Sequence, residues 1–211
     1  MSLELALESP QINDYLKPSA VVNADHPAIA AQAQALVEGT ASTVAQARIL
    51  YEWVRDAIAH TCDIQAVPVT CTASEVLHSG HGFCFAKAHL LAALLRSCGI
   101  PTGFCYQRLV FDDADPTLHT LHGLNAVYLK ELDRWMRLDA RGNKPGVQAE
   151  FGWSGPEPDF ADREQLAFPI RPHLGEIDYP IIFSQPHAAV VTALQTHPTA
   201  ADLIAHLPTT L

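Results

Sequence analysis

The sequence predicts an α+β fold in which helices come first and an antiparallel strand meander follows. Three observations lead to this prediction. Apolar residues recur at helical spacing in residues 42–59 and again from Phe85 to Cys98. Three segments rich in aromatic and branched residues follow at 103–111, 122–129 and 134–139, separated by polar turns. Helices followed by strands are typical of α+β domains, so we expect a helix packed on an antiparallel sheet.

The composition allows a buried core and argues against polyanionic partners. The 211 residues are 48% hydrophobic, which suits one domain of ordinary size. The net charge is −10, with only 13 Lys and Arg residues, so we expect neither nucleic acid nor a membrane as partner. No apolar stretch reaches the roughly 18 residues that span a bilayer, and MSLELALESP lacks the positive segment of a secretion signal. We therefore expect a cytoplasmic protein whose five cysteines are reduced.

We expect a single domain over residues 1–211. Its catalytic core covers about residues 40–145, and a Pro-rich tail wraps around it from 146 to 211. Two short helices are expected in the tail, near 187–195 and 200–206.

The first two helices have recognisable start and stop residues. Asp25 is the expected N-cap of the first, which Gly39 ends. Ser42 or Thr43 caps the second. Its core-facing residues are expected to be Leu50, Trp53, Val54, Ala57 and Ile58.

The next two helices lead to the centre of the molecule. Thr72 and Glu75 have the spacing of a capping box, which predicts a short helix closed by Gly80. The helix that follows is the best defined in the chain, and Gly99 stops it. Its apolar stripe consists of Leu91, Leu94, Leu95 and Cys98. His89 faces away from this stripe, so we expect solvent contact there.

The turn between the second and third strands decides which side chains meet. A four-residue loop at 130–133 pairs Leu129 with Arg134, which places His122 diagonal to Asp139 on one face. A two-residue loop would put the same two residues directly opposite each other. Either even-length loop brings the imidazole and the carboxylate together.

Cys84 lies immediately ahead of the central helix, in the stretch GHGFCFAKAHLL. A thiol there meets the positive end of the helix dipole and unpaired N–H groups, and both favour the thiolate. Gly80 and Gly82 permit a sharp turn and close approach of a substrate. A buried core cysteine is the alternative that position alone leaves open. A nucleophilic cysteine also needs a histidine base and an orienting acid, for which His122 and Asp139 are the candidates.

Three motifs carry a resemblance to a known family: ASEVLHSGHGFCFAKAHLLAALLRSCGIPTG, then HGLNAVYL, then RWMRLDARGNK. Together they resemble the transglutaminase-like superfamily of papain-like cysteine enzymes, especially its small bacterial branch, over about residues 49–144. In that family a Cys opens the central helix, a His begins a later strand and an Asp closes the next strand. The resemblance therefore implies a papain-like core with Cys84, His122 and Asp139 as a catalytic triad.

The resemblance also implies a mechanism. Cys84 would attack an amide or ester carbonyl and form a thioester, while His122 transfers the proton and Asp139 fixes the ring tautomer. The Cys84 N–H is the natural first donor to the oxyanion, and His60 is our candidate for the second. Helix C-terminal capping is the alternative role for His60, which we expect where the second helix ends.

Three further residues are candidates for substrate contacts. Phe83 stands where animal transglutaminases have the glutamine of Gly-Gln-Cys-Trp, so the acyl acceptor stays open. Arg141, and with it Lys144, follows the predicted acid and would lie at the rim of the site, where a cation suits a substrate carboxylate. A solvated turn is the alternative for both cations.

Other residues with suitable chemistry fit less well. His119 is the rival base, but we expect it ahead of the strand rather than in it. A zinc set can be imagined from four residues, although their spacing fits no common zinc pattern: Cys62, Cys71, His78 and His81. Cys98 and Cys105 are expected in the core. We expect no metal and no cofactor.

The expected function is therefore that of a thiol hydrolase, a peptidase or amidase acting on a peptide, a protein or a small amide. Two alternatives are an acyltransferase with an amine acceptor and a catalytically silent binding module on the same fold. Residues 145–186 are long enough to form part of a lid.

Overall fold

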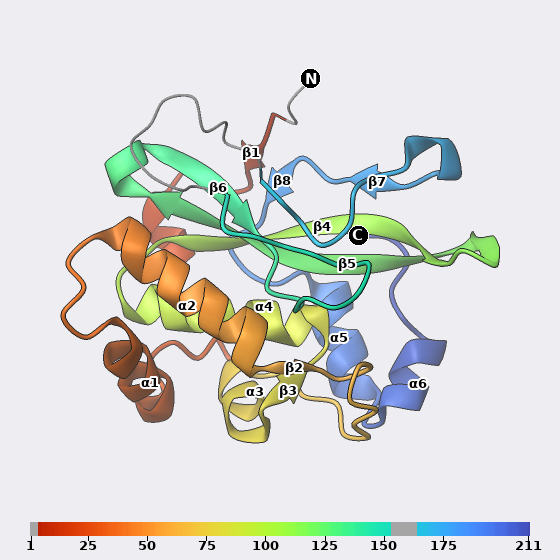
Figure 1. Cartoon of the computed structure of the whole chain (residues 1–211), viewed down its shortest axis with the longest axis horizontal. Helices are drawn as coiled ribbons and strands as arrows, with labels where there is room; N and C mark the ends of the chain where they lie inside the picture. The colour runs from red at the N-terminus through yellow and green to blue at the C-terminus, as the bar shows by residue number, and fades with distance from the viewer. Residues whose placement is uncertain (1–3, 153–163) are drawn as a thin grey trace.

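The computed structural model describes residues 4–152 and 164–211, and its centre is a four-stranded antiparallel sheet (Figure 1). In spatial order the strands are β6 (Arg134–Leu138), β5 (Asp115–Leu129), β4 (Thr102–Asp112) and β7 (Ile177–Asp178). The helices are α1 (Pro27–Val37), α2 (Thr43–Ala57), α3 (Ala73–Ser79), α4 (Cys84–Ser97), α5 (Ala188–Thr196) and α6 (Ala200–Ala205). Three 3-10 turns accompany them, η1 (Ile12–Leu16), η2 (Lys130–Leu132) and η3 (Pro172–Leu174). This arrangement confirms the predicted α+β fold.

Two small parallel pairs complete the described strands. One joins β1 (Ala6–Leu7) to β8 (Ile181–Ile182), and the other joins β2 (Ala59–His60) to β3 (His81–Gly82). The prediction that His60 ends the second helix was wrong, because α2 stops at Ala57 and the chain continues as β2. This pairing places His60 beside Gly82, two residues before the start of α4.

The helix ends follow the predicted capping chemistry with small differences. Ser42 accepts from the N–H of Ala45, and Thr72 and Glu75 form the full capping box. The predicted cap of α1 was wrong by one residue, because the His26 ring accepts from the N–H of Ala28. Ala57 is exposed rather than core-facing, because it lies in the last turn of α2.

The register of the hairpin is the one that a four-residue loop predicts. Leu129 pairs with Arg134, and Asn125 pairs with Leu138. β5 begins at Asp115, well before the predicted start at residue 122. His119 therefore lies within the strand, contrary to the prediction. Its segment is polar and exposed, so it lacks the apolar alternation by which strands are recognised.

Helix α4 is buried on all sides. It packs against β5 and β4 on one side and against α1, α2 and α3 on the other (Figure 1). His89 is only 1% exposed, so the prediction of solvent contact was wrong. Its Nδ1 lies 2.7 Å from the carbonyl oxygen of Cys71, which gives the ring a partner inside the protein. Within residues 4–152 and 164–211, no helix has the length and apolar character needed to cross a membrane.

One charged side chain of α4 is completely buried. Lys87 is 0% exposed, and its Nζ donates to the carbonyl oxygens of Ile58, Arg141 (3.1 Å) and Arg55 (3.3 Å). Burial lowers the pKa of Lys87 to about 7. These contacts tie α4 to the end of α2 and to the loop after β6, which carries Asp139 and Arg141.

Replacing Lys87 by methionine leaves three buried carbonyl groups without their donor. We expect Lys87→Met to lower the free energy of unfolding by about 3 kcal/mol, measured by urea denaturation at neutral pH. The exposed Lys130→Met serves as the control and should change it by less than about 0.5 kcal/mol. Equal effects of the two substitutions would contradict this role of Lys87.

Candidate active site

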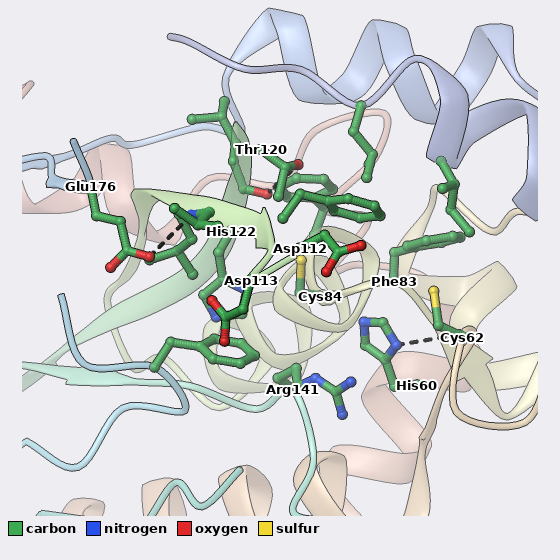
Figure 2. Close-up of a pocket in the computed structure, with 18 of the residues that line it drawn as sticks. His60, Cys62, Phe83, Cys84, Asp112, Asp113, Thr120, His122, Arg141 and Glu176 are labelled. Atoms are coloured by element: carbon green, nitrogen blue, oxygen red, sulfur yellow. Dashed lines mark hydrogen bonds between the residues drawn. The ribbon is translucent and has the colours of Figure 1, made fainter. Parts of the chain in front are cut away.

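A cavity of about 810 Å³ opens at the N-terminus of α4. Six of the site residues predicted from the sequence line it, namely His60, Phe83, Cys84, His122, Arg141 and Lys144. A seventh, Asp139, is 1% exposed and contacts the cavity wall through His122. In Figure 2 the sulfur of Cys84 lies between His122 on one side and His60 and Phe83 on the other. The fold therefore brings all seven residues to one place.

The first turn of α4 has free hydrogen-bonding capacity. The helix begins at Cys84, and its N-cap residue Phe83 provides no side-chain hydrogen bond. The N–H groups at this end are therefore left for another acceptor, and the helix dipole favours negative charge there. Gly82, two residues before the helix, is closely packed, since a Cβ atom on it would lie 3.2 Å from the hydroxyl oxygen of Thr70.

A glycine on β5 lets the strand approach this first turn. A Cβ atom on Gly123 would lie 2.6 Å from Cδ1 of Phe85, which is closer than real side chains pack. Phe85 follows Cys84 and Gly123 follows His122. This close approach therefore draws the imidazole toward the sulfur.

The imidazole of His122 is held by a buried acid. Its Nε2 lies 2.8 Å from Oδ2 of Asp139, and the two side chains are 6% and 0% exposed. Asp139 also accepts from the backbone N–H groups of Ala167 (3.0 Å) and Arg141 (3.2 Å). Because Asp139 occupies Nε2, the nitrogen left for Cys84 is Nδ1.

The charges in this group depend on one another. Burial opposes the positive charge on His122, but Asp139 and Cys84, by their charges and hydrogen bonds, raise its pKa to about 10. Burial likewise opposes ionisation of Asp139, yet the charge of His122 and the hydrogen bonds to the carboxylate hold its pKa below the ordinary value. These shifts favour an imidazolium at residue 122 that is paired with the carboxylate of Asp139 at neutral pH.

His60 lies on the opposite side of the sulfur and has a different charge state. Burial, assisted by the charge of Arg141, lowers the pKa of His60 well below its usual range, so the ring is neutral. Its Nδ1 accepts the N–H of Cys62 at 3.3 Å (Figure 2). A neutral ring that accepts at Nδ1 carries its proton on Nε2, which makes this nitrogen a donor. Phe83 packs edge-on against the ring, with the centroids 5.7 Å apart.

Two cations on the cavity wall share one carboxylate. Both nitrogens of the Arg141 fork donate to Asp63, one of them at 2.9 Å, and Lys144 Nζ lies 2.7 Å from the same carboxylate. These hydrogen bonds hold the pKa of Asp63 far below its usual range in spite of partial burial. Asp63 was not among the predicted site residues. Its place in the segment AHTCD next to His60 was the available signal.

A later segment of the chain packs against His122 and Asp139 and also lines the cavity, through Phe168 and Arg171. Ala167 donates its N–H to Asp139, and the Phe168 ring stands edge-on to His122 with centroids 5.1 Å apart. Arg171 ion-pairs with Glu176 and Asp113, which joins this segment to the β4–β5 hairpin. The sequence analysis did not predict these contacts with His122 and Asp139, although the segment lies within the predicted lid at 145–186. The part of that prediction at 153–163 lies outside the described residues.

The rival base predicted from the sequence, His119, lies outside the cavity. The His119 ring contacts the carbonyl oxygens of Thr117 (3.1 Å) and Leu174 (2.9 Å) and does not line the cavity. Over the described part of the chain, no group of three or more His, Cys, Asp or Glu side chains is arranged to hold a metal ion. Cys105 is buried as expected, and Cys98 packs against the core while half-exposed.

Comparison with known proteins identifies related sequences and structures. A family model described as "Transglutaminase-like superfamily" matches residues 30–140. A structure from Cytophaga hutchinsonii, described as a "Putative Cysteine Protease", has a TM-score of 0.52 and 17% identity. The match covers 66% of this chain and 46% of that one. At this identity the likeness shows the fold alone.

A second structure, described as a "putative protease" from Parabacteroides distasonis, has a TM-score of 0.42 and 15% identity. That match covers 65% of this chain and 26% of the other. The chain therefore spans less than half the length of both structures. No match was found among curated protein sequences.

The close contact between Gly123 and Phe85 leads to a prediction for the rate at which Cys84 is alkylated. We expect iodoacetamide at neutral pH to label Cys84 fastest of the five thiols, and His122→Ala to slow this labelling. Gly123→Ala should slow it by about tenfold or more, because an added Cβ must displace β5 from Phe85.

The labelling rate of Cys98, measured by mass spectrometry in the same samples, is the internal control and should stay constant. An unchanged rate at Cys84 in Gly123→Ala would show that the approach of β5 to α4 does not matter for the thiol.

Proposed function

Since this chain belongs to the transglutaminase-like superfamily, we propose that it is a cysteine hydrolase, a peptidase or amidase that acts through a thioester on Cys84. The observation that carries this proposal is the buried 2.8 Å contact between His122 and Asp139, in the wall of the cavity that Cys84 lines. An acid, an imidazole and a thiol in this order are what nucleophilic catalysis by cysteine requires.

In the acylation step, the sulfur of Cys84 attacks the carbonyl carbon of the substrate amide. A carbon–sulfur bond forms, and the carbonyl oxygen becomes an oxyanion. The imidazolium of His122 then gives its proton to the leaving nitrogen, the carbon–nitrogen bond breaks, and an amine departs. Asp139 keeps the ring oriented and stabilises its positive charge throughout.

The oxyanion needs donors placed before the reaction begins. The backbone N–H of Cys84 at the uncapped start of α4 is one donor. Nε2 of His60 is the second, because the neutral ring uses Nδ1 to accept from Cys62. In deacylation, neutral His122 takes a proton from water, which attacks the thioester and releases the acid and the Cys84 sulfur.

The cavity suggests the class of substrate. Its volume of about 810 Å³ and its apolar wall suit a peptide, a protein segment or a small amide with an apolar side chain. Arg141 and Lys144 together carry one positive charge more than Asp63 neutralises. That charge lies where a substrate carboxylate can meet it.

Acyl transfer to an amine is the second candidate function. Asp112 and Asp113 line the same cavity, and carboxylates there attract a cationic amine (Figure 2). The two functions differ in what cleaves the thioester, which is water in one and an amine in the other.

The test uses fluorescent casein for hydrolysis and a fluorescent primary amine for acyl transfer, both at neutral pH. Cys84→Ala and His122→Ala should each lower the rate by about 1,000-fold or more. His60→Ala should lower kcat by about 100-fold, as expected for loss of one oxyanion donor.

His119→Ala is the matched control, since it removes a histidine of the same strand that lies outside the cavity; its rate should equal that of the unchanged protein. Incorporation of the amine in preference to hydrolysis would favour the acyltransferase. Equal rates in Cys84→Ala and the unchanged protein would refute both functions.

A further inference from the structure

The strand that carries His122 has an open edge beside the cavity. Among the described strands, β6 pairs with β5 from Asn125 to Leu129 and goes no further. From His119 to Leu124, β5 is paired on its other side with β4. An unpaired strand edge is a template on which an extended chain can add hydrogen bonds.

A later segment of this chain already lies on that edge. The N–H of Leu121, next to His122, donates to the carbonyl oxygen of Pro208 at 2.8 Å. Leu207 lines the cavity, and both Leu207 and Leu211 pack against the core. Figure 1 shows the chain running from α6 back to the sheet. Residues 207–211 therefore occupy part of the approach to Cys84.

The attachment of this segment is incomplete. A residue paired with Leu121 in a ladder normally also donates its N–H to the Leu121 carbonyl. Pro208 has no N–H, and that carbonyl instead accepts from the Thr120 hydroxyl at 3.3 Å. Thr209 and Thr210 are exposed. A chain with an ordinary residue in place of Pro208 can form one more hydrogen bond to the strand.

We propose that the open edge of β5 at Leu121 binds an extended peptide substrate, with an apolar side chain in the place of Leu207. Residues 207–211 occupy this site as a displaceable internal competitor. The inference rests on the proposed function and narrows its substrate to extended peptides. Binding through the backbone tolerates many sequences, while the apolar cavity wall selects the side chain.

Peptide binding can be measured without catalysis. The protein is the full chain with Cys84→Ala, and the probe is a fluorescein-labelled peptide with the sequence of residues 205–211, followed by fluorescence anisotropy. Adding Leu207→Asp to the protein should weaken the internal competitor and raise the affinity for the probe by about 10-fold. Adding Pro208→Ala should strengthen the competitor and lower that affinity by about 2- to 10-fold, the value of one hydrogen bond.

Further measurements locate the binding and check the fold. The amide resonance of Leu121 should shift in Leu207→Asp and return toward its original position when the probe binds. A probe with aspartate in place of Leu207 is the control and should not bind. Circular dichroism establishes that the variants are folded, and a chain ended after His206 replaces Leu207→Asp if that variant unfolds.

The outcomes separate this inference from the proposed function. Equal affinity of all folded variants for the probe, or an unmoved Leu121 resonance, overturns the inference even when the protein hydrolyses casein. Tighter binding in Leu207→Asp with the Leu121 shift supports it even when no variant is active, in which case the proposed hydrolase function fails alone. In an active protein, Leu207→Asp should lower KM for a peptide several-fold with little change in kcat.

Discussion

The buried contact between His122 and Asp139 joins β5 to the start of the loop after β6 at the edge of the cavity, and the other features of the site depend on it. It occupies Nε2 of the ring, so Nδ1 is the nitrogen that remains for the sulfur. It also compensates for burying a positive charge, which alone would be costly. Asp139 has two backbone N–H donors of its own, from Arg141 and Ala167. Residues far apart in sequence, Asp139 and Ala167, therefore hold the imidazole of His122 in place.

The packing around α4 holds the sulfur of Cys84 in place, just as Asp139 holds the ring of His122. The helix is packed on all sides, and Lys87 fastens it to the end of α2 and to the loop that carries Asp139 and Arg141. Gly123 permits a close approach of β5 to Phe85. Rigid elements position reactive groups better than loops do. These contacts fix the positions of Cys84, His122 and Asp139 relative to one another.

The start of α4 and its stop at Gly99 could be predicted from sequence because they depend on local signals, an apolar period and a glycine. For the turn between β5 and β6 the sequence left two registers open, and the structure has the one with four loop residues. The burial of His89 could not be predicted, since it results from contacts with the Cys71 carbonyl and the Phe104 ring of β4, which are distant in sequence. The pairing of β2 with β3 is two residues long and leaves no periodic pattern. The contacts of Ala167 and Phe168 join distant segments, for which local patterns carry no information.

Nitrogen NMR of histidine side chains tests most directly whether Asp139 holds a charged imidazole at residue 122. With the pKa of His122 raised to about 10, both ring nitrogens should carry protons at pH 8 in the unchanged protein. In Asp139→Asn the ring should be neutral at the same pH, because its main stabilising charge is gone. A ring that is neutral at pH 8 in the unchanged protein, and titrates alike in both proteins, would contradict the account.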